Sequence, residues 1–326
     1  MGFSAKGGHM TITSDNLNLN LNLNLGATAA VNSALGYGGV RYNTEDFPKL
    51  NPPNFPANLA LPTPYPADWD PELRTWAYVR EFITAVAWPT ANDPVTSIYT
   101  QLLASPLFVP PTVTAPPGGP FPAATNPLTT AELAHQVIIV LDASIDRADR
   151  ALEIVDQATG PGALHYWTGM MRIDPSKDKF TFLLMMVALK IGEFVAMGLK
   201  DIFKMRRPAQ VYPLIVPLID GPDTPSFPSS HSTQAHLISG VLQLALPPLG
   251  PPPPAPPPVW NTRQALDWLA GRVAYNREVA GVHYRMDSDA GAFVADQCLA
   301  ALAGLPGGSL FGQLVAAATP ELQNMP

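Results

Sequence analysis

Apolar positions recur at helical spacing over most of the chain after residue 127. Side chains three and four residues apart share one face of a helix, so this pattern predicts helices rather than strands. We expect five long helices in this part of the chain: 129–158, 177–205, 232–246, 261–282 and 288–302. Another helical pattern runs from Pro71 to Trp88, where proline suits the first helical position and Asp70 can cap it.

The longest predicted helix, 129–158, has one continuous apolar face and Thr130 as a possible cap. That face consists of Leu133, Val137, Val140, Leu141, Ile145, Ala148, Leu152 and Val155. Gly160-Pro161-Gly162 should end this helix. His135 lies in the same helix and His165 lies beside Tyr166-Trp167, so we expect core packing or a supporting hydrogen bond for both histidines.

The first third of the chain has a different pattern. Asn16 to Leu25 alternates asparagine and leucine, which predicts a strand with one apolar face, although a frayed tail fits equally well. From Phe47 to Pro127 there are 18 prolines, which favour loops, turns and short helices wrapped over a core. We divide the chain into a leader or tail (1–15), a proline-rich wrapping segment (16–127) and a helical-bundle catalytic domain (128–326). The predicted fold class is all-α, a helical bundle with a loop-dominated N-terminal third.

Composition indicates a substantial core and argues against a nucleic-acid partner. Hydrophobic residues make up 47% of the chain, charged residues 14%, and the net charge is -7. The most apolar run, Phe180 to Leu199, is interrupted by Lys190 and Glu193, so we interpret it as a buried helix and expect no membrane span. Cys298, the only cysteine, excludes an internal disulfide and should be a buried thiol. No secretory signal is visible, and the sequence leaves the compartment open between a cytoplasmic protein and a periplasmic or secreted one whose signal has been removed.

Basic residues gather in one short stretch of this acidic chain. Lys200 and Arg207 are seven residues apart, which on a helix places them within about 20° of each other on one face. Both could reach one oxyanion, the lysine as a point charge and the arginine as a planar fork. The alternative is a solvated basic helix end that includes Lys204 and Arg206, because cations favour helix C-termini.

The segment Pro228-Ser229-Ser230-His231 comes directly before the predicted helix 232–246. Free backbone N–H groups, two hydroxyls and an imidazole at a helix start would attract an oxyanion. A helix cap is the ordinary explanation for either serine. A positively charged histidine is disfavoured at this end of the helix dipole, so His231 is easier to explain if an anion lies beside it.

His283 and Asp287 are four residues apart. On a helix, the carboxylate can then hold one ring nitrogen while the other nitrogen faces a ligand or substrate. Arg277 lies about 240° from His283 on an ideal helix. Either the helix breaks near Gly281, or Arg277 reaches around it by its length.

Taken in chain order, these three groups resemble a known signature. Lys200-x6-Arg207-Pro208, Pro228-Ser229-Ser230-His231 and Arg277-x5-His283-x3-Asp287 are similar to the motifs of one superfamily. It joins type 2 phosphatidic acid phosphatases, bacterial class A acid phosphatases and vanadium-dependent haloperoxidases. The resemblance extends from Lys200 to Asp287 and implies the helical bundle of that superfamily. The family usually has glycine at the position of Ser230 and often serine at that of Asn276.

The resemblance implies a role for each matched residue. His231 would be the general acid or base. His283 would be bonded axially to vanadium or, in a phosphatase, would be the phosphorylated nucleophile, with Asp287 fixing its tautomer. The remaining residues would donate to the equatorial oxygens of the ion: Lys200, Arg207, Ser229, Ser230 through its backbone N–H, and Arg277.

The implied cofactor is vanadate, and phosphate could occupy the same site because vanadate mimics phosphoryl transfer. The run Gly281-Val282-His283-Tyr284-Arg285 is more similar to the haloperoxidase branch than to the phosphatases. In a haloperoxidase, hydrogen peroxide would oxidise halide to a hypohalous-type species that halogenates a small organic acceptor, with His231 taking a proton from the peroxide. Thr224 stands where haloperoxidases often have phenylalanine or histidine, which favours bromide over chloride.

Two other functions fit the same residues. One is a soluble acid phosphatase that acts through a phosphohistidine intermediate. The other is a non-catalytic oxyanion-binding protein that keeps the fold, although the intact His231 and His283 argue against it. Because family members are often dimers, a homodimer is expected, and the Asn16–Leu25 strand would offer an arm for it.

Overall fold

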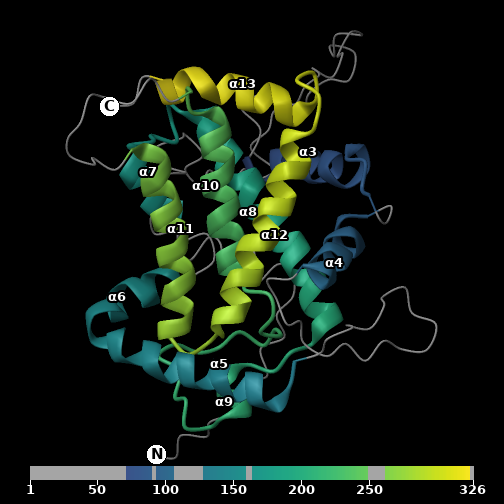
Figure 1. Ribbon diagram of the computed structural model, residues 1–326. Coiled ribbons are helices and arrows are strands. Elements are labelled where there is room, and N and C mark those ends of the chain that lie inside the picture. Colours follow the sequence, from purple (N-terminus) through teal and green to yellow (C-terminus); the bar gives the residue numbers. More distant parts are fainter. Residues whose placement is uncertain (1–70, 90–92, 106–127, 159–163, 249–260, 324–326) are drawn as a thin grey trace, which may run out of the picture. The chain divides into compact units, whose positions relative to one another are not determined.

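The computed structural model of the protein describes residues 71–89, 93–105, 128–158, 164–248 and 261–323 (Figure 1). The predicted leader, the Asn16–Leu25 strand, Asp70 and most of the proline-rich wrapping segment lie outside the described residues, as does the Gly160-Pro161-Gly162 stop.

All the regular elements in the described ranges are helical, which confirms the all-α class. Before the site region they are α3 (Pro71–Ala85), α4 (Pro94–Ala104), α5 (Thr130–Ala143), the 3-10 turn η2 (Ser144–Asp146), α6 (Arg147–Gln157) and α7 (Leu164–Met171). The others are α8 (Lys179–Phe203), α9 (Pro208–Val211), α10 (Ser230–Ala245), α11 (Thr262–Val279), α12 (Arg285–Ala303) and α13 (Leu310–Gln323).

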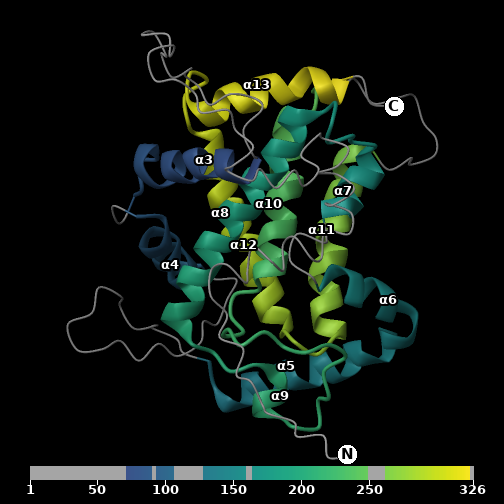
Figure 2. The same cartoon turned by 180° about the vertical axis from the view of Figure 1, so that it is seen from behind.

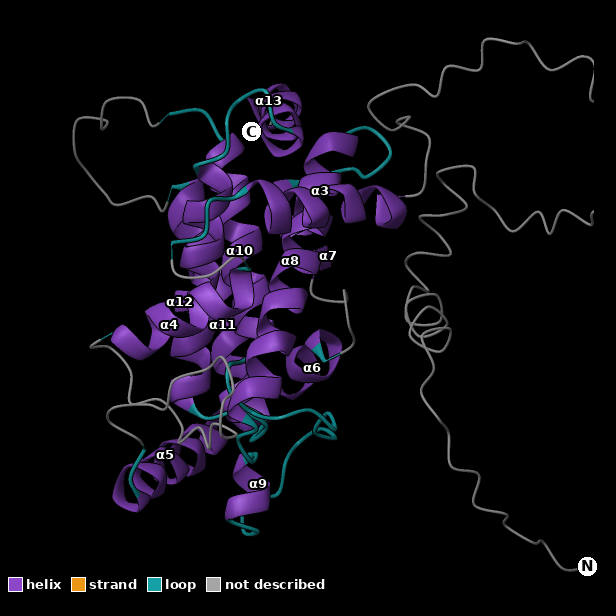
Figure 3. Ribbon diagram, turned by 90° about the vertical axis from the view of Figure 1, so that its right-hand side faces the viewer, coloured by secondary structure: helices purple, strands orange, loops and turns teal. Residues whose placement is uncertain are grey.

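Helix α10 occupies the centre of the helix packing. It packs against α8, α11 and α12, while α13 crosses one end and α3 lies against α8 (Figures 1 and 2). The apolar side chains of these helices form one contiguous core, in which Cys298 is fully buried as predicted. The turn between α11 and α12 lies at the opposite end from α13, near α5 and α9 (Figure 3).

Helix α8 is the central apolar helix predicted from the run Phe180 to Leu199. Among the described residues, the stretch from Lys179 to Val211 alone is long and apolar enough to cross a membrane by composition. Its most apolar window is 67% buried against the rest of the protein. The core helix of a soluble protein has these same properties, because it is covered by other helices instead of lipid.

The prediction of one helix over 129–158 is wrong. Helix α5 ends at Ala143, the Ser144 hydroxyl donates to the Leu141 carbonyl at 2.6 Å, and a 3-10 turn redirects the chain into α6. The cap is Thr129 rather than Thr130. The Thr129 hydroxyl accepts from the Glu132 N–H at 3.2 Å, and the Glu132 carboxylate accepts from the Thr129 N–H at 2.7 Å.

The bend also divides the predicted apolar face. Ile145 and Leu152 are 81% and 89% exposed, because α6 no longer continues the line of α5. A different side of α6 is buried instead, through Ile154 and Gln157. This orientation gives α6 a direct part in the candidate site.

Helices α10 and α12 approach closely beside that site. A Cβ atom at Gly291 would lie 2.7 Å from both the Ser229 carbonyl oxygen and the Ser232 Cβ, so only glycine fits there. The Ser229 N–H donates to the Asp287 carbonyl at 2.9 Å, and the Ser232 hydroxyl donates to the Ser288 carbonyl at 2.6 Å. These contacts fix the start of α10 against the start of α12.

Candidate anion site

The turn between α11 and α12 separates Arg277 from His283. Helix α11 ends at Val279, and Gly281 adopts a φ of 79°, which favours glycine. Of the two arrangements considered from the sequence, the structure therefore has the helix break near Gly281. The main-chain carbonyl of Arg277 accepts from the N–H of Val282 and of His283, at 3.2 and 3.3 Å.

His283 and Asp287 form the predicted hydrogen-bonded pair. His283 lies just before α12, and its Nδ1 is 2.9 Å from Asp287 Oδ2. The same oxygen accepts from the Ser226 hydroxyl at 2.5 Å and from the Tyr284 N–H at 3.0 Å. Because the carboxylate accepts the Nδ1 proton, the Nε2 lone pair of His283 is left to face the site.

Lys200 and Arg207 meet in space, but not through helical spacing. Helix α8 ends at Phe203, and Lys204 adopts a left-handed φ of 49° that turns the chain away from the helix axis. Arg207 then precedes α9. The prediction that both cations share one helix face is wrong, because the helix ends between them.

The two cations nevertheless bind the same loop. The Lys200 ammonium donates to the carbonyls of Pro225 and Ser226 at 2.5 and 2.9 Å. The Arg207 guanidinium donates through Nε to the Thr224 carbonyl at 2.9 Å, and its Nη1 lies 3.3 Å from His283 Nε2. Both side chains are buried, at 2% and 5% exposure.

Ser229 and Ser230 begin α10, as the sequence predicts. Ser229 is the cap, since its hydroxyl accepts from the Ser232 N–H at 3.3 Å. The helix thus starts two residues earlier than predicted, and Ser230 and His231 belong to its first turn. The N–H groups of Ser230 and His231 have no acceptor within the helix, so they could donate to an anion.

His231 faces the C-terminal end of α6. Its Nε2 lies 3.1 Å from the Gln157 carbonyl, which can only accept, so Nε2 carries the proton and the Nδ1 lone pair is unprotonated. Burial and the nearby Arg277, His283 and Lys200 lower the pKa of His231 well below its ordinary value. His231 is therefore neutral and able to accept a proton.

Burial, followed by the charges of Lys200, Arg207 and Arg277, also lowers the pKa of His283 well below its ordinary value. Both imidazoles thus lie within electrostatic reach of the same cations. The structure brings together all the predicted site residues: Lys200, Arg207, Ser229, Ser230, His231, Arg277, His283 and Asp287.

Arg277 has donors that the described protein groups do not satisfy. Its side chain is 1% exposed, and its Nη2 donates to the Ile154 carbonyl at 3.0 Å and to Gln157 Oε1 at 3.4 Å. Its Nε and Nη1 have no hydrogen-bond partner among the described residues. Leaving charged donors unsatisfied costs several kcal/mol, which a bound oxyanion would offset.

The charged side chains around the site carry an excess of positive charge, which an anion would also offset. Three buried cations, Lys200, Arg207 and Arg277, face one buried carboxylate, Asp287, near Lys200 and Arg207, and one partly buried carboxylate, Glu153, near Arg277. Burial, and then the charge of Arg207, lowers the pKa of Lys200, as expected where positive charge is in excess. An anion of charge minus one or minus two would restore the balance.

Sequence reasoning missed Ser226, Gln157 and Asn276 as parts of this network. The Asn276 side chain donates to Gln157 Oε1 at 2.9 Å and accepts from Arg150 at 3.0 Å. These contacts connect positions that are far apart in the chain, and no local spacing signals them. His135 and His165, predicted to pack in the core or support the site, are instead exposed, and His165 lies 2.9 Å from Asp156.

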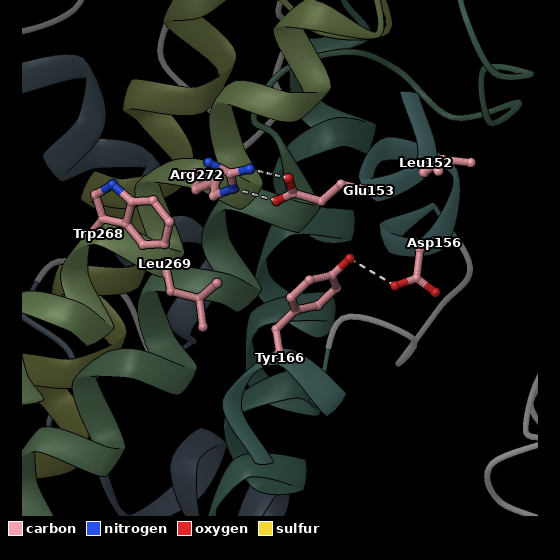
Figure 4. A pocket seen from close by; sticks show the side chains of 7 residues that line it. All are labelled: Leu152, Glu153, Asp156, Tyr166, Trp268, Leu269 and Arg272. Carbon is pink, nitrogen blue, oxygen red and sulfur yellow. Dashed lines mark hydrogen bonds and ion pairs between the residues drawn. The ribbon is translucent and has the colours of Figure 1, made fainter. Parts of the chain in front are cut away.

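A pocket lies away from these residues, between α6, α7 and α11 (Figure 4). It holds about 650 Å³ and its charged side chains have partners. Arg272 donates to both oxygens of Glu153, and the Tyr166 hydroxyl donates to Asp156 at 2.8 Å. Because Glu153 also accepts from Gln157 at 3.0 Å, this pocket borders the network that holds Arg277.

We expect Gln157→Leu to destabilise the protein by about 1–3 kcal/mol, because Asn276 and Arg277 would each lose a buried acceptor. Urea unfolding would measure the free energy of unfolding. Gln234→Leu is the matched control, since the Gln234 side chain makes one bond, to the Leu189 carbonyl at 3.3 Å. Equal losses in the two variants would contradict this account of Gln157.

Comparisons with family models and with curated proteins find no match to this chain.

Proposed function

We propose that this protein is a vanadate-dependent haloperoxidase with the helical bundle of the haloperoxidase and acid phosphatase superfamily, and that it oxidises bromide with hydrogen peroxide. The observation that carries the proposal is the convergence of three buried cations on His283, with two donors of Arg277 unsatisfied by the described residues. A bound oxyanion would satisfy these donors and offset the buried positive charge.

The donor set fits a tetrahedral or trigonal oxyanion. Arg277, whose Nε and Nη1 have no partner among the described residues, would hold its oxygens together with Lys200, Ser229 and the Ser230 N–H. The N–H groups of Arg207 now donate to the Val282 carbonyl and to Thr224, and its Nη1 lies 3.3 Å from His283 Nε2, so Arg207 and His283 would exchange these contacts for the ion. Bound vanadate would supply the activation of hydrogen peroxide toward halide. Phosphate has the same shape and charge and would compete for these donors.

The two histidines would have separate tasks. Asp287 holds the Nδ1 proton of His283, which keeps Nε2 as a lone pair for bonding to the ion. The Gln157 carbonyl holds the Nε2 proton of His231, which leaves Nδ1 to take a proton from a substrate. The low pKa of His231 keeps that nitrogen unprotonated at neutral pH.

The deciding experiment is bromination of phenol red by purified protein supplied with bromide, hydrogen peroxide and orthovanadate. We expect halogenation that depends on vanadate and that added phosphate inhibits. Turnover of p-nitrophenyl phosphate without halogenation would instead indicate the acid phosphatase, in which His283 is phosphorylated. Tight vanadate binding with neither reaction would indicate a non-catalytic oxyanion-binding protein.

Oxyanion binding should be accompanied by proton uptake at Lys200. Burial lowers the pKa of Lys200 below 10.5 in the free protein, and a bound anion would favour the ammonium and raise that pKa again. Affinity is then greatest below the free-state pKa and falls as the pH rises through it. Sulfate is a suitable probe because it stays divalent over this range.

Calorimetric titration of sulfate in two buffers of different protonation enthalpy would count the protons taken up. The uptake should disappear in Lys200→Met. If this variant takes up as many protons as the unchanged protein, Lys200 is not the group that titrates.

A further inference from the structure

A second pocket reaches Arg207 from the outside of the protein. It holds about 420 Å³, within the range of sites for small organic ligands. Its walls come from the end of α8, from α9, from the loop 217–225 and from the α11–α12 turn. Arg207 and Val282, which line it, are joined by a 2.7 Å hydrogen bond. Val282 directly precedes His283, and Arg207 Nη1 lies 3.3 Å from His283 Nε2.

The walls and the rim of this pocket differ in chemistry. Apolar groups predominate along the walls: Met205, Ala209, Pro217, Pro222, Pro225 and Val282. The charged side chains Lys204, Arg206 and Asp223 also line it. Lys204 and Arg206 are exposed, and the ion pair of Lys204 with Asp201, at 3.8 Å, is long and solvated.

Three cations, Lys204, Arg206 and Arg207, and one carboxylate, Asp223, line this pocket, in contrast to the net charge of -7 on the whole chain. A local positive field in an acidic protein attracts anions and raises their association rates. Apolar walls of this size accept a carbon skeleton at the same time. A ligand that uses both features has an apolar body and one negative group.

We infer that this pocket binds the organic acceptor of the reaction, and that Lys204 and Arg206 select acceptors carrying a carboxylate or another anionic group. The inference rests on the proposed function, because it places the acceptor beside the site where halide is oxidised. With the acceptor bound in this pocket, halogenation would take place within the protein rather than in free solution.

The test compares 4-hydroxybenzoate with its methyl ester, which share one ring and differ in charge. Bromination of each is measured as kcat/KM at saturating bromide. The unchanged protein should prefer the acid, and the double variant Lys204→Ala/Arg206→Ala should lose about tenfold for the acid and little for the ester. Added salt should also reduce the preference of the unchanged protein for the acid, because it screens the charges of Lys204 and Arg206.

Lys177→Ala/Lys179→Ala is the matched control. It removes the same charge from exposed positions at the far end of α8, about 37 Å away along the 25-residue helix. This control should keep the preference for the acid. Equal losses for acid and ester, or equal effects of the two double variants, would overturn the inference.

Two further measurements separate this inference from the proposed function. Tribromide formation in the absence of an organic acceptor measures bromide oxidation alone. If no tribromide forms, the proposed function is wrong. Equilibrium dialysis with 4-hydroxybenzoate and, separately, with its methyl ester then measures binding to the pocket independently of any reaction. Charge-selective binding that Lys204→Ala/Arg206→Ala removes would support the pocket assignment, and equal binding of both compounds would overturn it.

Discussion

Replacing His283 with alanine should abolish retention of vanadate, whereas replacing His231 with alanine should leave the ion bound and lower turnover by roughly 10²–10⁴-fold. The difference follows from the partners of each ring. Asp287 directs the free nitrogen of His283 toward the cations, while His231 is fixed by a carbonyl of α6 and acts on protons. Dialysis followed by elemental analysis for vanadium, with bromination rates on the same samples, measures both effects.

His236→Ala is the matched control for these two variants. His236 lies on α10 like His231, but its Nδ1 is 2.8 Å from the Ser232 carbonyl within its own helix. Neither vanadium content nor rate should change in this variant. Equal loss of vanadium from the His231 and His283 variants, with circular dichroism showing folded protein, would refute the division of roles.

Replacing Arg277 with methionine should stabilise the anion-free protein by about 1–3 kcal/mol and weaken oxyanion binding at least 100-fold. The gain is expected because removing a buried charge with two unsatisfied donors should outweigh the loss of the Arg277 bonds to the Ile154 carbonyl and to Gln157 Oε1, which Asn276 still satisfies. The loss is expected because truncating one partner of a buried charged pair costs about 2–5 kcal/mol. Thermal unfolding with and without vanadate measures both quantities.

Higher stability without the anion together with weaker anion binding is expected only if Arg277 serves to bind an anion. An arginine that served only to hold α6 against α11 would lower stability when replaced, with or without the anion. Arg263→Met provides that comparison, because the Arg263 guanidinium donates to carbonyls at the end of α10, with Nη1 2.6 Å from the Gln243 oxygen. We expect this variant to be destabilised and to bind vanadate normally.

The sequence was sufficient to predict four helices of the core, but α4, α7 and α13, which also contribute buried side chains, were not predicted. Helical periodicity located α8, α10, α11 and α12 to within a few residues, because a buried stripe repeats along each helix. It failed over 129–158, where a stripe continues through a bend that depends on packing against other helices. Local pattern contains no information about such tertiary contacts.

The same limit applied within the site. The spacing of His283 and Asp287 correctly predicted their hydrogen bond, since both residues lie in one local turn. The prediction that Lys200 and Arg207 lie close together was correct, but the helical spacing it relied on was not, because α8 ends between them. Gln157 could not be found at all, because its partners on α10 and α11 are more than 70 residues away in the chain.

Under the proposed function, the cations of the site would recognise oxygen atoms through N–H groups, which vanadate and phosphate satisfy equally, and His283 alone among the described side chains would contact the central atom. In a cell where phosphate is plentiful and vanadium is scarce, most newly made molecules would acquire phosphate first. The fraction of competent enzyme would then be set by nutrient supply and by how quickly phosphate leaves, rather than by how much protein is synthesised.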